Sequence, residues 1–230
     1  MTVFQRVEPV SKKTRVVASL KEAILAGMIQ SGEPIVEGKI AQQFGVGQGL
    51  IREALIELEH QGFVTRTPFS GTEVVKLTSE DAQQIFDLRC ALEPLAVSLA
   101  GPLMSVRQVE ELARLADAAK RAAEAQDLDR FFENHLAFRR KIWEFSGNKY
   151  LQQALERVVI PLYALYLIRR SSKRENIQNT VVDCIDNQDK IIAAYHAGDF
   201  AGAKQAAHDF LLRMKEYLKT ALSPASTSEQ

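Results

Sequence analysis

The sequence predicts a mainly α-helical protein in two parts: three short helices with a β-hairpin, then an antiparallel bundle of six to seven helices. Apolar residues recur with a 3.6-residue period over most of residues 79–222. Short segments with glycine or proline separate the periodic stretches, so neighbouring helices should run antiparallel. Two β-rich runs, FVTRT and TEVVKL, interrupt the helical pattern after residue 62.

The bulk composition narrows the class of protein. Of the 230 residues, 46% are hydrophobic and 25% charged, as in ordinary globular domains. Since no run of about 18 apolar residues occurs, we expect no membrane span. Cys90 and Cys184 lack metal-ligand spacing and are predicted to be reduced, buried thiols in a cytoplasmic protein.

The first part of the chain has the element order of a winged helix-turn-helix. Helices are predicted over residues 14–26, 37–44 and 48–61, and Gly27, Gly45 and Gly62 end them. The hairpin turns at PFSG, where proline and glycine supply the turn. We therefore predict a winged helix-turn-helix over residues 14–77, a fold that places its third helix in the DNA major groove.

Residues 1–13 are predicted to be a basic N-terminal arm. Within the first 21 residues, Arg6, Lys12, Lys13, Arg15 and Lys21 face only one acidic residue, Glu8. Such an arm can neutralise phosphates, and the alternative is a disordered, solvated terminus. The formal net charge of zero argues against a non-specific nucleic-acid coat.

The second part, residues 79–222, is predicted to be an all-helical domain for effector binding and dimerisation. Its six helices are expected at residues 79–100, 105–125, 127–146, 148–170, 176–197 and 199–222. Thr78 or Ser79 is a suitable N-cap for the first of them. The polar tail at 223–230, SPASTSEQ, is predicted to be disordered.

The third helix has a face suited to reading DNA. Gln48 and Arg52 lie one turn apart on the side away from the apolar stripe. Glutamine can read adenine, and arginine can read guanine or hold a phosphate. The glycines on either side of Gln48 leave backbone N–H groups free to approach a phosphate. The alternative for Arg52 is an ion pair with Glu53 or Glu59 on the same helix.

These residues resemble the DNA-binding domain of the GntR family of bacterial transcription regulators. The matching segments are AILAGMIQSGEPI, EGKIAQQFGVGQGLIREALIELEHQGFV and SGTEVVKL. In that family the residue at Gln48 is usually a base-contacting arginine, so the change should alter the operator that is read. The resemblance and the helix pattern together predict DNA contacts by Lys39, Gly47, Gln48, Gly49, Arg52, Arg66, Gly71 and Thr72.

The helical part is similar to the effector domain (FCD type) of the FadR-like branch of that family. The matching segments are DLRCALEPLAVSLA, HLAFRRKIWEFSGNKYL and IIAAYHAGDFAGAKQAAHDFL. Many members of the branch hold a divalent metal, and its four ligand positions fall here on His135, Arg139, Gln188 and Phe210. A guanidinium stays protonated and is no ligand, so we predict neither a structural metal nor another cofactor.

The same positions predict a small-molecule pocket. His135 and Arg139 lie within the apolar stripe of their helix, and Gln188 lies within that of another. Arg89, beside the stripe of Ile85, Leu88 and Leu92, matches a family arginine that faces the cavity. Converging polar groups in a helical cavity are typical of a ligand site, and two arginines can hold a carboxylate.

The predicted effector is therefore an anionic metabolite such as an organic or sugar acid. Three alternatives stay open: Arg139 pairs with Glu93 or Glu133, His135 is a hydrogen-bonded core histidine, and Gln188 only packs.

The function that follows is a sequence-specific, ligand-responsive transcription regulator, in this family most often a repressor. A palindromic double-stranded operator implies a homodimer, and ligand binding would change operator affinity. Neither a ligand set nor a nucleophile–base pair is found, so no enzyme is predicted. The alternative is an effector-independent regulator or architectural protein with a vestigial sensor pocket.

Overall fold

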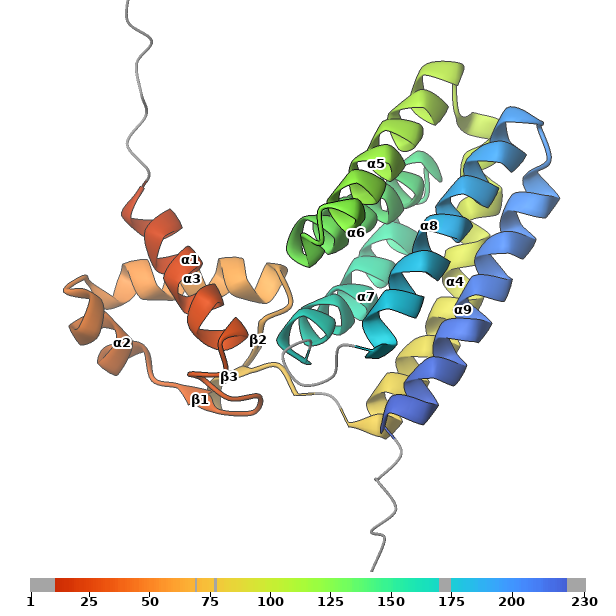
Figure 1. The fold of residues 1–230 in the computed structure, drawn as a ribbon. Helices are drawn as coiled ribbons and strands as arrows, with labels where there is room; N and C mark the ends of the chain where they lie inside the picture. The colour runs from red at the N-terminus through yellow and green to blue at the C-terminus, as the bar shows by residue number, and fades with distance from the viewer. Residues whose placement is uncertain (1–10, 69, 77, 170–174, 223–230) are drawn as a thin grey trace, which may run out of the picture. The chain divides into compact units, whose positions relative to one another are not determined.

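The computed structural model describes residues 11–68, 70–76, 78–169 and 175–222 (Figure 1). The predictions of a basic arm over residues 1–10 and of a disordered tail over 223–230 lie outside these ranges. The chain divides into two compact units, Met1–Lys76 and Leu77–Gln230. Within the described ranges, every helix is too short or too polar to cross a bilayer.

The N-terminal unit contains three helices, α1 (Lys12–Leu25), α2 (Glu37–Phe44) and α3 (Gln48–His60). Helix α3 packs on both of the others through Ile51, Leu55 and Leu58, which are fully buried. Because four apolar residues share this face, burial rather than helix propensity holds α3 in place.

Helix α1 starts two residues earlier than predicted. The Ser11 side chain accepts a hydrogen bond from the Thr14 backbone N–H at 3.1 Å and caps the helix there. Lys12 and Lys13 therefore belong to α1 and not to an arm, and Lys13 lies 3.7 Å from Glu57 of α3. The apolar stripe alone did not reveal this polar first turn.

The wing is a three-stranded antiparallel sheet in the order β1–β3–β2, formed by β1 (Pro34–Ile35), β2 (Val64–Thr67) and β3 (Gly71–Val74). The register pairs Thr67 with Gly71 and Val64 with Val74 across the hairpin. Gly71 has φ +100°, a backbone conformation that favours glycine. The predicted hairpin is thus present, and β1 is a strand that the pattern analysis did not anticipate.

The C-terminal unit is a bundle of six α-helices in its described part (Figure 1). They are α4 (Ser79–Ala100), α5 (Val106–Glu124), α6 (Leu128–Phe145), α7 (Lys149–Arg169), α8 (Glu175–His196) and α9 (Phe200–Leu222), with a 3₁₀ turn, η1 (Gly101–Leu103), after α4. Helix α4 contacts α6, α7 and α9, while α5 and α9 both contact α8. The mainly α-helical fold class predicted from the periodicity is confirmed.

Helix α4 begins with a capping box and contains a proline. Thr78 accepts from the Asp81 N–H, and the Asp81 carboxylate accepts from the Thr78 N–H at 2.8 Å. Pro94 lies inside the helix, where it lacks the N–H that would bond to the carbonyl four residues earlier. Both features matter for the candidate ligand pocket described below, because α4 also carries Arg89 and Glu93 of that pocket.

The buried face of α4 differs from the predicted one. Leu88 is 49% exposed, and the buried positions are instead Phe86, Arg89, Glu93 and Val97. The apolar stripe of Ile85, Leu88 and Leu92 misled the prediction, because a charged pair was not expected to replace apolar residues in the core.

The C-terminal unit also contains the tryptophan and both cysteines of the sequence. Trp143, the only tryptophan, is 1% exposed and belongs to the core of the C-terminal unit. Both cysteines are free thiols, but only Cys184 is buried as predicted, whereas Cys90 is half-buried. The fluorescence of Trp143 can therefore report the unfolding of this unit.

Candidate nucleic-acid interface and ligand pocket

The first turn of α3 presents backbone and side chains to the surroundings. Gly47 is the N-cap and has no side chain to bond the N–H groups of the turn. Gly47, Gln48 and Gly49 are exposed, and a Cβ at either glycine would meet nothing within 4 Å. Open N–H groups at a helix N-terminus form a site for a phosphate oxygen.

Arg52 is held by the preceding helix. Its Nη2 donates to the Glu37 carboxylate of α2 at 2.8 Å, and its Nε lies 3.2 Å from the same oxygen. The predicted alternative, a pair with Glu53 or Glu59, is therefore not the arrangement found. The Glu37 hydrogen bond and charge raise the pKa of Arg52. The guanidinium is thus oriented by α2 while its side chain stays 57% exposed.

Lys39 and Gln48 complete this face. Lys39 on α2 is exposed. Gly38 of α2 faces the Gln48 side chain, and a Cβ at this glycine would lie only 3.2 Å from the Gln48 amide nitrogen. The lack of a side chain at Gly38 therefore lets the start of α3 lie close to α2. The exposed set on the two helices therefore contains amide, ammonium and guanidinium groups, the donors that read bases and phosphates.

In the wing, one predicted contact is wrong in its side-chain direction. Thr72 is 8% exposed, because side chains alternate along β3 and Thr72 shares the buried side with Val74. Gly71 is exposed at the end of the hairpin turn, and Arg66 lies 3.9 Å from Glu59 of α3. Arg66 and Gly71 remain candidates, and Thr72 supports the sheet instead.

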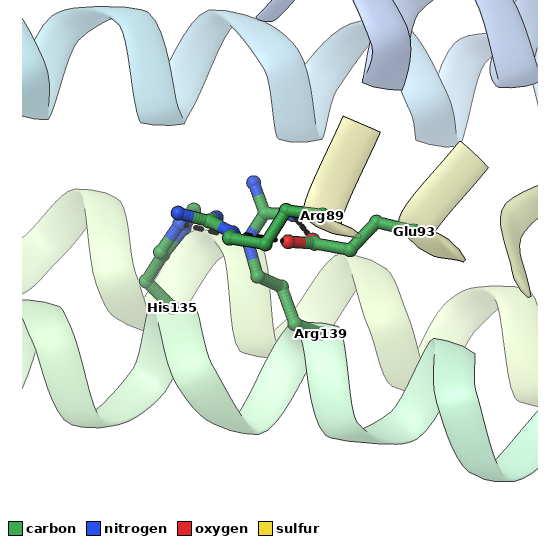
Figure 2. A network of polar contacts seen from close by, with 4 residues as sticks. All are labelled: Arg89, Glu93, His135 and Arg139. Atoms are coloured by element: carbon green, nitrogen blue, oxygen red, sulfur yellow. Dashed lines mark hydrogen bonds and ion pairs between the residues drawn. The ribbon is translucent and has the colours of Figure 1, made fainter. Parts of the chain in front are cut away.

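The C-terminal unit encloses a network of four charged or polar side chains (Figure 2). The Glu93 carboxylate bridges two guanidiniums: one oxygen accepts from Arg89 Nε at 2.6 Å and the other from Arg139 Nη1. Arg139 Nε also donates to His135 Nε2 at 3.2 Å. All four residues are at most 5% exposed, so the network lies within the protein.

Helix geometry explains how the network assembles. His135 and Arg139 are four residues apart on α6 and Arg89 and Glu93 are four apart on α4, so each pair lies on one helix face. Aromatic rings surround the cations: Arg89 lies 4.6 Å above the Phe86 ring and Arg139 lies 4.9 Å above that of Phe210. Such contacts favour a buried guanidinium.

Several buried polar atoms near the network have no hydrogen-bond partner among the described residues. These atoms are His135 Nδ1, Arg139 Nη2 and both amide atoms of Gln188. An unpartnered buried donor is costly, so such atoms mark a place for a water or a ligand.

A small cavity of about 20 Å³ adjoins the network. Its lining combines two groups of the network with apolar and neutral polar side chains, namely Arg89, Phe132, His135, Tyr163, Thr180, Cys184, Phe210 and Met214. The space suits about one water, so a larger guest requires the helices to part. The cavity has the mixed lining that is typical of ligand sites.

Three of the four predicted effector residues meet in this region. Arg139 donates to His135 directly, and Glu93 links Arg139 to Arg89. Gln188 is buried on α8, close enough to His135 for its amide to favour the protonated imidazole, while neither amide atom has a hydrogen-bond partner of normal geometry among the described residues. The alternative partner proposed for Arg139, Glu93, is also present, so the arginines hold an internal carboxylate.

Sequence reasoning missed other residues of the pocket. Tyr163 and Cys184 were not predicted, and Glu93 was considered only as a structural partner. Burial raises the pKa of Cys184 to about 12 and also raises the pKa of Tyr163, against the opposing charges of Arg139 and Arg89. Both side chains are therefore neutral and can donate hydrogen bonds.

The residues at the family's metal position do not fit a metal. His135 uses its Nε2 to accept from Arg139, and the guanidinium lies where a cation would bind. Within the described ranges, no three His, Cys, Asp or Glu residues lie together as a ligand set. Absence of a structural metal therefore stays a prediction with a physical reason.

Two shifted pKa values predict how stability depends on pH. Burial, Arg139 and Arg89 hold the pKa of His135 well below the usual 6.5. Burial favours the neutral acid at Glu93, but Arg139 and Arg89 outweigh it and lower its pKa below 4.5. In both cases the unfolded chain binds the proton more readily, so acid favours unfolding.

We expect the free energy of unfolding of the C-terminal unit to fall as pH drops below 6.5, by up to about 1.4 kcal/mol per pH unit for His135. A further loss should begin below pH 4.5, from Glu93. Urea unfolding followed by Trp143 fluorescence measures this. His135→Gln should flatten the profile between pH 6.5 and about 5, whereas His196→Gln, which removes an exposed histidine of the same unit, should leave it unchanged. An unaltered slope in His135→Gln would contradict the assignment.

Comparison with known families covers both units. Residues 12–74 match the bacterial regulatory proteins of the gntR family, and residues 84–213 match the FCD domain. The second match alone spans more than half of the chain. The two matched segments contain every residue of the two candidate sites except Met214 of the cavity lining.

Individual proteins give the same picture. The chain is 31% identical over 143 residues to the uncharacterized HTH-type transcriptional regulator YdhC of Bacillus subtilis, a match that covers 60% of this chain and 62% of the relative, less than two thirds of it. It is 24% identical to the gluconate operon transcriptional repressor of Bacillus licheniformis, covering 82% and 77% of the two chains. The solved structure of Escherichia coli McbR/YncC shares the fold with a TM-score of 0.69 at 21% identity, over 93% of this chain and 99% of that one.

Proposed function

The chain belongs to the GntR family of transcription regulators with an FCD effector domain, and on that premise we propose a repressor that binds its operator as a homodimer and responds to a small anionic metabolite. The observation that carries the proposal is the combination of an exposed α3 N-terminus with a buried arginine pair beside a cavity. The first suits DNA, and the second suits a small ligand.

The proposed DNA contacts lie on α2, α3 and the wing. Gln48 and Arg52 read bases, while Lys39 and the N–H groups at Gly47 and Gly49 hold phosphates. Arg52 has a fixed direction because Glu37 holds it from α2. Arg66 and Gly71 place the wing against the DNA backbone. Gln48 should favour adenine at its base position, since its amide can donate to and accept from that base.

The proposed effector site comprises Arg89, His135, Arg139 and Gln188. Its guanidiniums favour an anionic group, and the neighbouring rings of Phe132 and Phe210 suit a short carbon skeleton. An organic or sugar acid has both features. Effector and operator would be coupled reciprocally, so an acid that binds one DNA-binding arrangement better changes operator affinity.

A homodimer follows from the way such proteins read an inverted repeat. Two half-sites related by a two-fold axis need two copies of α3. Two apolar side chains of helix α4 are left exposed by the part of the chain that the structure describes, Leu88 at 49% and Leu95 at 40%. We place the contact between subunits on this outward face, since apolar residues at interfaces are buried by the partner. A regulator of this kind works in the cytoplasm and is not an enzyme.

A second candidate function is an effector-independent regulator or architectural protein. The observation that favours it is that Glu93 already neutralises much of the arginine pair, which would make the pocket vestigial. Ligand binding distinguishes the two, because only a working pocket is stabilised by a metabolite.

The test is a gel shift with footprinting on DNA upstream of the protein's own gene, repeated with a panel of carboxylic and sugar acids. We expect a protected inverted repeat with two chains per repeat, and one acid that weakens or strengthens binding. Protection of a single half-site by one chain would contradict the dimer. Specific binding that no acid changes would favour the effector-independent function.

A further inference from the structure

The buried network carries one positive charge in excess. Glu93 contributes one negative charge against the guanidiniums of Arg89 and Arg139. His135 adds none, because its Nε2 accepts a hydrogen bond from Arg139 and therefore holds no proton. The neighbouring Asp183 on α8 and Arg213 on α9 pair with each other at 3.5 Å and leave this balance unchanged.

The unpartnered atoms at the network are mostly donors. With Nε2 as an acceptor, the neutral imidazole of His135 carries its proton on Nδ1, which has no partner among the described residues. Arg139 Nη2 and the amide nitrogen of Gln188 lack one too. All three side chains are at most 5% exposed. These three donors outnumber the one unpartnered acceptor of the group, Gln188 Oε1, and lie beside an excess positive charge, so together they favour an anion.

We propose that this site binds a monoanion, and that Glu93 sets that charge by acting as a permanent internal counter-ion. The proposal rests on the effector function above and specifies its ligand class. One added negative charge balances the network, and its oxygens accept from the unpartnered donors. A dianion would leave a buried negative charge in excess, which is strongly disfavoured. Glu93 is therefore a specificity-determining residue and not only a structural one.

The geometry also indicates why Glu93 stays in place when the ligand binds. Each of its oxygens is held by a different guanidinium from a different helix, α4 and α6. The unpartnered Arg139 Nη2 is a separate nitrogen from the Nη1 that holds Glu93. A ligand can thus add to the network without expelling the carboxylate, and the small cavity beside Arg89 and His135 is where it would enter.

The experiment compares probes that differ in charge and little in shape. Monomethyl malonate is the monoanion and malonate the dianion, with acetate as a smaller monoanion, all at one ionic strength because salt screens charge. Binding is measured by calorimetry on the full-length protein. The shift in the thermal unfolding midpoint, followed by Trp143 fluorescence, gives a second measurement. Wild-type protein should bind acetate and monomethyl malonate about tenfold or more tightly than malonate, since one buried charge alters affinity by at least that factor.

Glu93→Gln keeps the shape and raises the excess to two positive charges. This variant should prefer malonate, by about tenfold relative to wild type. Arg89→Gln tests the same balance in the opposite direction and serves where Glu93→Gln does not fold: it removes the excess charge, so monoanions should bind about tenfold less tightly. Arg140→Gln is the matched control on α6, because Arg140 lines a different hollow on the α5–α7 side of the unit.

Several outcomes would overturn the proposal. If the wild-type protein binds malonate as tightly as monomethyl malonate, the site does not select by charge. If it binds neither compound, water satisfies the unpartnered donors. Loss of binding in Arg140→Gln but not in Arg139→Gln would place the anion in the other hollow.

Operator binding is measured separately by gel shift on the same preparations. Intact operator binding without anion selectivity refutes this inference alone. Anion selectivity without operator binding refutes the proposed DNA-binding function alone.

Discussion

Replacing Glu93 by alanine should destabilise the C-terminal unit by about 3–5 kcal/mol. The substitution leaves two guanidiniums buried at no more than 5% exposure without their shared carboxylate. An uncompensated buried charge is among the most destabilising changes in a protein, because neither water nor a partner solvates it. Urea unfolding followed by Trp143 fluorescence isolates this unit, since the single tryptophan lies in its core.

Two controls separate charge from lost volume. Glu111→Ala removes a glutamate that pairs with Lys141 at 3.3 Å and is 37% exposed, and we expect well under about 1 kcal/mol from such a surface pair. Acetate added to Glu93→Ala should recover part of the lost stability, since its carboxylate can occupy the space between the two arginines. A Glu93→Ala variant as stable as wild type would show that the two arginines reach water or another partner, which contradicts the buried network.

Replacing Arg52 by alanine should weaken operator binding by about tenfold to a hundredfold, the range for a base-reading arginine. The fold should be unaffected, because the Arg52–Glu37 pair is exposed and such pairs contribute little to stability. Fluorescence anisotropy with the footprinted operator measures the effect. Arg107→Ala, which removes an exposed arginine from α5 in the other unit, is the matched control and should bind as wild type does.

The same titration distinguishes the two roles open to Arg52. If the guanidinium reads a base, the loss is concentrated on the cognate operator, and binding to unrelated DNA changes little. If it holds a phosphate, binding weakens on both DNAs and the salt dependence becomes shallower by about one ion. Unchanged affinity for both DNAs would show that Glu37 keeps Arg52 as a structural pair, with no part in DNA binding.

Apolar periodicity predicted most of the fold because most of the energy of helix packing is carried by apolar faces. On α6 the predicted stripe of Phe132, His135, Arg139 and Ile142 is indeed buried. On α4 the same method selected Leu88, which is exposed, because Arg89 and Glu93 occupy the core face instead. Their burial depends on Arg139, 46 residues beyond Glu93, and the sequence offered this pair only as one alternative for Arg139, because no local pattern selects a partner so far along the chain.

The DNA-binding unit shows a similar division. The positions of α2 and α3 and the open glycines at the start of α3 were predictable from turn and helix signals. The side-chain direction of Thr72 was not, because a shift of one residue in strand register exchanges the two faces of a strand. The partner of Arg52 was also missed, since Glu37 lies on another helix and becomes a neighbour only when α2 packs on α3.

The proline next to Glu93 removes one backbone hydrogen bond from α4 and so marks the place where this helix can bend. Pro94 offers no N–H to the carbonyl of Cys90, so the helical turn that holds Glu93 is the one least stiffened by its own backbone. The capping box at Thr78 fixes the opposite end, and about 21 Å of helix separates Ser79 from Glu93. A tilt of about 5° at the proline would therefore displace the first turn of α4 by about 2 Å. A change in the charge balance at Glu93 that tilts α4 at this proline would therefore move the end of the helix that directly follows the DNA-binding unit in the chain.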